Sequence, residues 1–221
     1  MLPEVVWNMP RYGSYNLHGS LLPRYRGAAP INWAVINGES VTGVTSFKLK
    51  HEIDTGSICL QKEIPIYPSD NAGDLHDRMK YIAAEVVLET VIKIKDNDIL
   101  LTEQNDSELS HAPKLNKENT QINFNLSVRE VNNFVRGLSP FPTAWLTFNN
   151  NHLKIYKAEV NLASSDYHPG DIVSDNKNYI NIYCTDGYIS LIELQYTGKR
   201  KMGVKEFLNG FDMAACATKI V

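Results

Sequence analysis

The chain has 221 residues, of which 43% are hydrophobic and 21% charged, and its formal net charge is −3. This composition is typical of one large or two small globular domains, and it excludes a disordered chain. The negative charge argues against a general polyanion binder, and Cys59, Cys184 and Cys216 lack the spacing of a zinc site or disulfide framework. We find no apolar run long enough for a membrane span and no signal-peptide pattern, and therefore expect a cytoplasmic protein without a membrane partner.

Hydrophobic patterning predicts alternating strands and helices in the first part of the chain. Tyr15 to His18 has the pattern of the end of a short strand, and residues 30–37 form a helix between Pro30 and Gly38. β-rich runs follow at 43–49 and 57–66. A long amphipathic helix is predicted over 73–95, lying against a sheet, and its core-facing stripe would contain Leu75, Met79, Ile82, Val86, Val87, Val91 and Ile94.

The second part of the chain has the pattern of a small β domain. Residues 96–118 are polar and aperiodic, which predicts a linker between residues 1–95 and residues 119–221. A short helix over 127–138 begins at a capping Ser. Turn residues then separate five β-rich runs, typical of a small, closed or partly closed barrel, at 144–148, 153–160, 171–173, 179–184 and 188–195.

The densest chemical pattern is Asn16-Leu17-His18. Alternate residues of a strand face the same side, so the amide and the imidazole point into one pocket. Such a pair suits acyl transfer, because the amide can donate to a developing oxyanion while the imidazole moves a proton. The alternative is an ordinary strand-end His18 bonded to a loop carbonyl.

Asp54 lies in a polar loop between two β-rich runs, followed by Thr55 and Gly56. An Asp that forms a turn with its own backbone is one interpretation. The other is functional: in an open α/β sheet, loops at the carboxyl ends of adjacent strands converge, and Asp54 would then join Asn16 and His18.

Three motifs carry a resemblance to a known family. They are NLHGSLLPRYRGAAP at 16–30, GVT at 43–45 and IDTG at 53–56, and together they closely resemble the folate-dependent formyltransferase family. The second half is similar to the branch of this family that formylates methionyl-tRNA. That likeness is carried by APKL at 112–115, SPFPTAW at 139–145, GKRKM at 198–202 and EFLNG at 206–210.

The resemblance implies an α/β fold in which a doubly wound, Rossmann-like formyltransferase domain precedes a small OB-like β-barrel. Family members have further strands before the one that carries Asn16 and His18, so we expect a truncated catalytic domain here. On this basis residues 1–95 would be the C-terminal portion of that domain, residues 96–118 the linker, and residues 119–221 the tRNA-binding domain.

The resemblance also implies a reaction, in which a formyl group moves from 10-formyltetrahydrofolate to the α-amine of methionyl initiator tRNA at the start of translation. Asn16, His18 and Asp54 would be the catalytic trio, without a metal and without an obligate protein partner. The residues that would border the folate are Leu2, Pro3, Ser20, Leu21, Leu22 and Pro23.

Basic residues suggest where tRNA phosphates could bind. Lys199, Arg200 and Lys201 form the chain's run of three like charges, which is either a phosphate-binding loop or a solvated one. Arg24 and Arg26 either reach the tRNA or pair with acidic residues. Trp145 and Phe148 are expected in the core of the small domain, with base stacking as the alternative; Lys154, Lys157 and Lys205 could extend the basic patch.

Two other functions fit the same residues. The chain could be a catalytically inert tRNA-binding fragment, if its folate pocket lacks a wall. It could also be a formyltransferase that acts on an amino-sugar nucleotide, because such enzymes resemble this one in the trio formed here by Asn16, His18 and Asp54.

Overall fold

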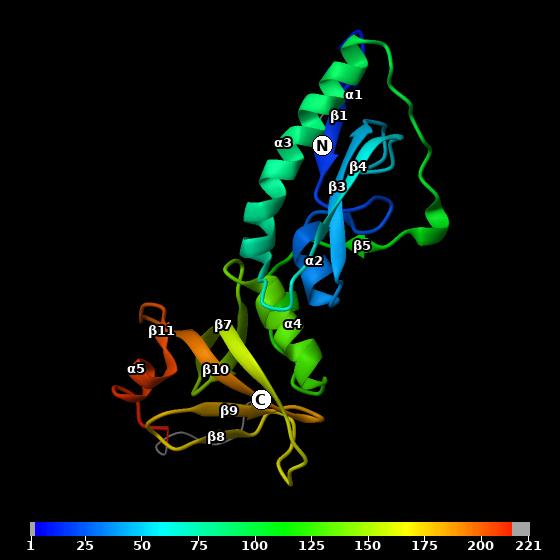
Figure 1. Ribbon diagram of the computed structural model, residues 1–221. Helices are drawn as coiled ribbons and strands as arrows, with labels where there is room; N and C mark the ends of the chain where they lie inside the picture. Colours follow the sequence, from blue (N-terminus) through cyan, green and yellow to red (C-terminus); the bar gives the residue numbers. More distant parts are fainter. Residues whose placement is uncertain (1–2, 214–221) are drawn as a thin grey trace. The chain divides into compact units, whose positions relative to one another are not determined.

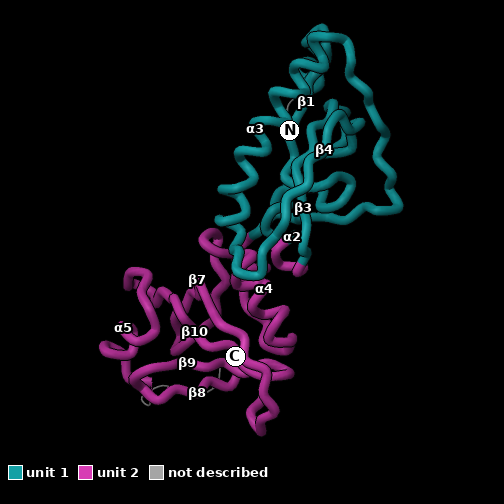
Figure 2. The backbone as a smooth tube through the Cα atoms, in the orientation of Figure 1, with its two compact units in different colours: residues 1–34, 39–115 teal, residues 35–38, 116–221 magenta. Residues whose placement is uncertain are grey.

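The computed structural model describes residues 3–213, which divide into two compact units (Figure 2). Unit 1 consists of Met1–Ala34 and Glu39–Leu115, and unit 2 consists of Val35–Gly38 and Asn116–Val221. None of the helices that the structure describes has the length and apolar character that crossing a membrane requires.

Unit 1 is built on a three-stranded antiparallel sheet. The strands β1 (Tyr15–His18), β3 (Val41–Lys48) and β4 (Ile58–Pro65) lie in the order β1-β3-β4 (Figure 1). Both pairings are antiparallel, with His18 opposite Thr45 and Val44 opposite Lys62. The described part of unit 1 is therefore α/β, as expected, but its sheet is antiparallel and lacks the parallel neighbours of a doubly wound sheet, because β3 and β4 form a hairpin and β3 runs opposite to β1.

The long helix α3 (Ala72–Lys95) packs on β3 and β4. It begins at Asn71, which forms a capping box with Asp74. Its buried side includes Leu75, Met79, Val86 and Thr90, whereas Val87 and Val91 of the predicted core stripe are 46% and 55% exposed. Val87 and Val91 are exposed because a single sheet covers only one side of a helix, and the apolar stripe of this helix is wider than that side.

The predicted linker, 96–118, crosses unit 1 before it reaches unit 2. Thr102 bridges Ile58, and β5 (His111–Ala112) pairs in parallel with β2 (Arg26–Gly27). The same unit contains α1 (Glu4–Trp7) and the 3-10 turn η1 (Asp106–Glu108), and α2 (Pro30–Ile36) begins in it.

Unit 2 is a six-stranded antiparallel sheet against which the helices α4 and α5 pack. The order of five strands is β6-β7-β10-β9-β8, and β11 pairs with β10. The helix α4 (Val128–Leu138) packs on β6, β7 and β10, and its start at Ser127 has the capping box that the sequence predicts. The remaining bounds are η2 (Glu118–Thr120), β6 (Ala144–Phe148), β7 (Asn151–Leu162), β8 (Ile172–Ser174), β9 (Ile180–Tyr183), β10 (Gly187–Tyr196), β11 (Met202–Gly203) and α5 (Val204–Leu208).

The five β-rich runs of the second half are all strands, but their sheet is open. Among the described residues β6 and β8 stand at its two edges and do not pair with each other, so the sheet is a half-barrel. Its inner face is a close-packed core that includes Leu146, Leu153, Ile155, Ile182 and Leu194, each at most 1% exposed.

Candidate functional site

Unit 1 contains a cleft of about 600 Å³ beside strand β1. Asn16 and Asp54 both line it, and the Asn16 side chain is exposed and makes no hydrogen bond to any other described residue. The rest of the lining mixes apolar and charged groups: Pro3, Glu4, Trp7, Tyr15, Leu49, Lys50, His51, Glu52 and Ile53. An amide donor and a carboxylate therefore face the same cavity.

His18 lies behind this cleft with only 6% of its surface exposed. Its Nε2 is 2.8 Å from the carbonyl oxygen of Tyr25, and because a carbonyl can only accept, Nε2 carries the proton. Nδ1 is 3.7 Å from Oδ2 of Asp54. Nδ1 is therefore the ring nitrogen without a hydrogen, and it faces the carboxylate of Asp54.

Tyr25 is a site residue that the sequence does not reveal. Its φ of 61° lies in the left-handed region, its N–H donates to Ser110 Oγ at 2.8 Å, and its hydroxyl donates to Glu39 at 2.6 Å. The carbonyl of Tyr25 thus fixes the tautomer of His18, so the loop-carbonyl bond given above as the alternative is present, and Nδ1 still faces Asp54.

Asp54 is held from both its side chain and its backbone. The Gly27 N–H donates to Oδ2 at 3.0 Å, the same oxygen that faces His18. Gln104 donates from Nε2 to the carbonyls of Asp54 and Gly56, at 2.8 Å each. These contacts fix the position of the Asp54 carboxylate. Asp54 itself has a φ of 56°, in the left-handed region.

Arg26 supports Gln104 rather than presenting a free charge. It donates to Gln104 Oε1 from Nε at 2.9 Å and from Nη2 at 2.6 Å, and Nη2 also bonds Asp106 at 2.8 Å. Its side chain is 11% exposed. The structure thus places Arg26 beneath the Asp54 loop, where binding a tRNA phosphate would require breaking these bonds. Gln104 lies in the predicted linker, and no local pattern marks it.

The trio comes together by a different route from the predicted one. Strand β3 leads into the loop that contains Asp54, and because β3 runs opposite to β1 this loop starts beside Tyr15 rather than beside His18. The loop then folds back toward His18. The carboxyl ends of the adjacent strands β1 and β3 therefore do not converge as expected, although the side chains of Asp54 and His18 do meet.

The residues predicted to border a folate have different positions. Pro3 lines the cleft, and Leu2 lies outside the described residues. Ser20 is fully buried and donates to the carbonyl of Arg24 at 2.6 Å, while the Leu22 N–H donates to Thr45 at 3.1 Å. Pro23 is buried and Leu21 half-buried, so residues 20–23 form a packed loop rather than an open surface.

The predicted basic contacts are mostly in ion pairs. Arg24 pairs with Glu39, and Arg200 pairs with Glu206. Lys201 donates to Glu193 at 2.8 Å and lies 5.2 Å from the ring centre of Tyr156. Lys199 is exposed and has no ion pair within residues 3–213.

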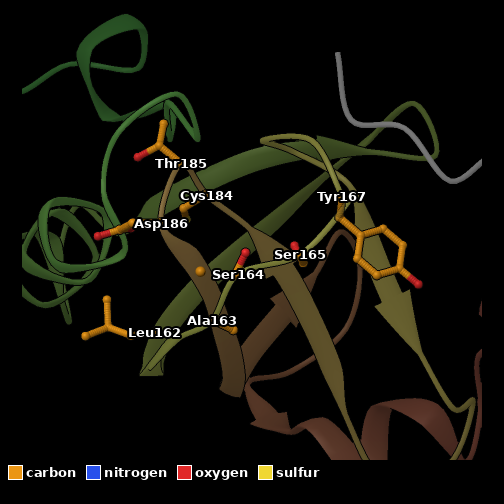
Figure 3. A pocket seen from close by; sticks show the side chains of 9 residues that line it. Leu162, Ala163, Ser164, Ser165, Tyr167, Cys184, Thr185 and Asp186 are labelled. Carbon is orange, nitrogen blue, oxygen red and sulfur yellow. The ribbon is translucent and has the colours of Figure 1, made fainter.

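Unit 2 has a second cavity, of about 550 Å³, lined partly by Ser164, Tyr167, Cys184 and Asp186 (Figure 3). Asp186 accepts the N–H of Val128 at 2.7 Å, so this carboxylate caps helix α4. Burial raises the pKa of the Cys184 thiol to about 12, which leaves it protonated at neutral pH. The Cys184 thiol is therefore not a ready nucleophile, and Asp186 is engaged in the helix cap, whereas the cleft of unit 1 has both an acceptor and a donor.

Two other chemistries find little support in the described residues. Burial also raises the pKa of Cys59 to about 11, so it is not a thiolate at neutral pH. Within residues 3–213 we find no group of three His, Cys, Asp or Glu side chains arranged to hold a metal ion.

Comparison with known proteins identifies the chain's relatives. Residues 1–91 match the formyl transferase family model, and residues 114–212 match the model of the formyl transferase C-terminal domain. The chain is 47% identical to the methionyl-tRNA formyltransferase of Phocaeicola vulgatus over 96% of its own length and 68% of the relative's.

Solved structures agree on the fold. An N-formyltransferase from Helicobacter canadensis, solved with folinic acid and dTDP-3-aminofucose, is 25% identical with a TM-score of 0.64, over 82% of this chain and 65% of that one. HypX from Aquifex aeolicus, solved with tetrahydrofolic acid, is 21% identical with a TM-score of 0.69, over 94% and 37%. The two family models and the close relative together place this chain in the formyl transferase family, with its N-terminal and C-terminal domains both represented.

Proposed function

We propose that this chain transfers a formyl group from 10-formyltetrahydrofolate to the α-amine of methionyl initiator tRNA. The observation that carries the proposal is that Asn16 and Asp54 line one cleft, while Nδ1 of the buried His18 lies 3.7 Å from Oδ2 of Asp54. Relatives that bear the name methionyl-tRNA formyltransferase support the acceptor. A role in translation initiation agrees with the expected cytoplasmic location.

The chemistry follows from the three side chains. The amine attacks the formyl carbon, a new C–N bond forms, and the carbonyl oxygen becomes negative. The free amide of Asn16 donates to this oxygen. The attacking amine loses a proton, which Nδ1 of His18 accepts, and Asp54 stabilises the resulting imidazolium. The proton then goes to the N10 nitrogen as the old C–N bond breaks.

The cleft has the properties that a folate needs. Its volume, about 600 Å³, lies within the range of roughly 300–1,000 Å³ typical of small-molecule pockets. Trp7, Leu49 and Ile53 supply apolar surface, and Asn16 and Asp54 supply convergent polar groups. We propose that Pro3 and the 20–23 loop, with Leu2 before them, border the bound folate.

For the tRNA we propose unit 2 as the principal binding domain. We propose that this domain spans residues 119–221, follows a connecting segment at 96–118 and is an OB-like barrel. The basic loop at Lys199, Arg200 and Lys201 supports it, and Arg24 would add a contact from unit 1. The alternative of an amino-sugar nucleotide as acceptor gains support from the Helicobacter neighbour, and an inert tRNA-binding fragment is the second alternative.

A comparison of acceptors tests the proposal. The purified chain is given 10-formyltetrahydrofolate with methionyl initiator tRNA in one reaction and with a dTDP-amino sugar in another. We expect formylation of the tRNA alone. Formylation of the sugar alone would show that the acceptor is an amino-sugar nucleotide. Binding of tRNA without formylation of either substrate would show that the chain is an inert tRNA-binding module.

Gln104 offers a test of how Asp54 is positioned. In Gln104→Leu the carbonyls of Asp54 and Gly56 lose their donor, and Arg26 loses one of its two acceptors and keeps Asp106. We expect kcat to fall by about tenfold, because a misplaced catalytic group is costly even at small displacements. Gln121→Leu, at an exposed position, is the matched control, and equal turnover of both variants would contradict the positioning role.

The basic loop is tested by salt dependence. Replacing Lys199, Arg200 and Lys201 together by Ala should weaken tRNA binding and flatten the plot of log affinity against log salt, by up to about 0.9 per lost phosphate contact. Arg200 and Lys201 must exchange a carboxylate partner for a phosphate, so the decrease in slope should be smaller than that expected for three full phosphate contacts. An unchanged slope would identify an ordinary solvated loop.

A further inference from the structure

Strands β6, β7 and β10 of unit 2 have one buried face and one open face. The buried face is apolar, whereas the outer face carries Trp145, His152, Lys154, Tyr156 and Gln195. Trp145, Lys154 and Gln195 form one row across the three strands, because Lys154 pairs with both of the others. The open face of an antiparallel sheet usually carries polar side chains, so aromatic rings between lysines call for another explanation.

Two of these rings form a supported stack. The ring centres of Trp145 and His152 are 4.2 Å apart with an angle of 32° between the planes. Trp145 Nε1 donates to the carbonyl of Lys117 at 3.0 Å, and Lys117 Nζ lies 5.7 Å from the ring centre of Trp145. The backbone of His152 exchanges hydrogen bonds with Thr197. His152 is thus a fixed ring backed by a second ring, and it needs little further ordering to receive a ligand. The expectation that Trp145 fills the core is wrong, while Phe148, 4% exposed, does fill it.

A small slot opens beside His152. It has a volume of about 210 Å³ and is lined by His152, Lys154, Gln195, Tyr196, Thr197 and Gly198. This is below the roughly 300 Å³ of pockets that enclose a whole ligand, so it suits one planar ring of a larger molecule. A side chain on Gly198 would meet no atom within 4 Å, which shows that the slot is open on that side.

The charges around the slot favour a phosphate-bearing ligand. Lys154 lines the slot and Lys199 follows Gly198 directly, and neither forms an ion pair with any residue that the structure describes. The nearby acids Glu193 and Glu206 are already paired with Lys201 and Arg200. The uncompensated charge at this edge of the sheet is therefore positive.

We propose that this slot binds one unpaired nucleotide of the tRNA, with its base stacked on His152 and its flanking phosphates bound by Lys154 and Lys199. The inference rests on the proposed tRNA acceptor. Stacking accepts any base and phosphate contacts carry no sequence, so the site adds affinity and fixes orientation rather than selecting a sequence.

The test compares two variants of one residue in the full chain. His152→Ala removes the ring, and its Kd for initiator tRNA should rise about tenfold. His152→Tyr keeps a ring and should restore binding to near the wild-type Kd. The salt slope of His152→Ala should equal that of the wild type, because stacking displaces no counterion, whereas Lys154→Ala should lower the slope by up to about 0.7 for a single strand. Lys177→Ala, an exposed lysine elsewhere in unit 2, is the charge control.

The possible outcomes distinguish failure of the proposed slot from failure of the proposed tRNA acceptor. If the wild type binds and formylates tRNA and His152→Ala has the same Kd as the wild type, the proposed slot alone is overturned. A rise in Kd that His152→Tyr does not reverse would also overturn it, because the effect would then not depend on an aromatic ring. If the wild type itself neither binds nor formylates tRNA, the proposed function fails and the slot fails with it.

Discussion

His18→Ala is expected to lower kcat by about 100-fold or more while the Kd for tRNA stays nearly unchanged. The side chain is buried, so it makes no surface contact, but its Nδ1 is the atom that accepts the amine proton. Asn16→Ala and Asp54→Ala should have effects of similar size. Because the three groups serve one transition state, the double variant His18→Ala with Asp54→Ala should lose much less than the product of the single losses.

The control is His76→Ala, since His76 is an exposed histidine on α3 with 64% of its side chain accessible. Steady-state kinetics with saturating 10-formyltetrahydrofolate, together with filter binding of the tRNA, separates kcat from affinity. Near-normal turnover in His18→Ala would remove this residue from the mechanism. A loss of tRNA affinity as large as the loss of kcat would indicate disturbed folding instead.

Gly56→Ala is expected to disrupt the site through the backbone. A Cβ on Gly56 would lie 1.6 Å from the carbonyl oxygen of Lys48, so one of the two chain segments must move. The Lys48 N–H donates to the Ser57 carbonyl at 2.9 Å, and Gln104 holds the Gly56 carbonyl, which ties both segments in place. We expect the free energy of unfolding to fall by about 3 kcal/mol and kcat to fall by tenfold or more.

Thermal unfolding and turnover of Gly56→Ala should be compared with those of Gly210→Ala, where an added Cβ meets nothing within 4 Å. The second variant should keep both its Tm and its kcat. Wild-type values in Gly56→Ala would show that the Asp54 loop tolerates movement, and the role given to its fixed geometry would then be wrong.

Local signals predicted the elements well, because their causes lie within a few residues. Helix α4 starts at Ser127, whose side chain and that of Glu130 cap it reciprocally, and β6 occupies the predicted residues 144–148. Strand direction has no such local cause. The antiparallel pairing of β1 with β3 depends on how residues 19–40, which connect the two strands, fold back along the sheet, and the alternation of apolar residues does not encode it.

The candidate site shows the same division. Asn16, His18 and Asp54 stand in motifs that can be recognised, whereas Gln104 is 50 residues from the loop it holds, in a segment without pattern. Tyr25 acts through its carbonyl, an atom that every residue has, so its identity gives no signal. Whether Trp145 lies on the buried or the open face of the sheet depends on which side of β6 packs on α4, and an aromatic residue is compatible with either side.

The most direct test of the account is the product of a single reaction. The chain is mixed with 10-formyltetrahydrofolate and methionyl initiator tRNA, the aminoacyl bond is hydrolysed, and the released amino acid is analysed by mass spectrometry. We predict N-formylmethionine in amounts equal to the tetrahydrofolate formed, and with Asp54→Asn an initial rate of formation of both products that is lower by about 100-fold or more. Unmodified methionine from a wild-type chain that binds both substrates would contradict the claim that Asn16, His18 and Asp54 form a working formyl-transfer site.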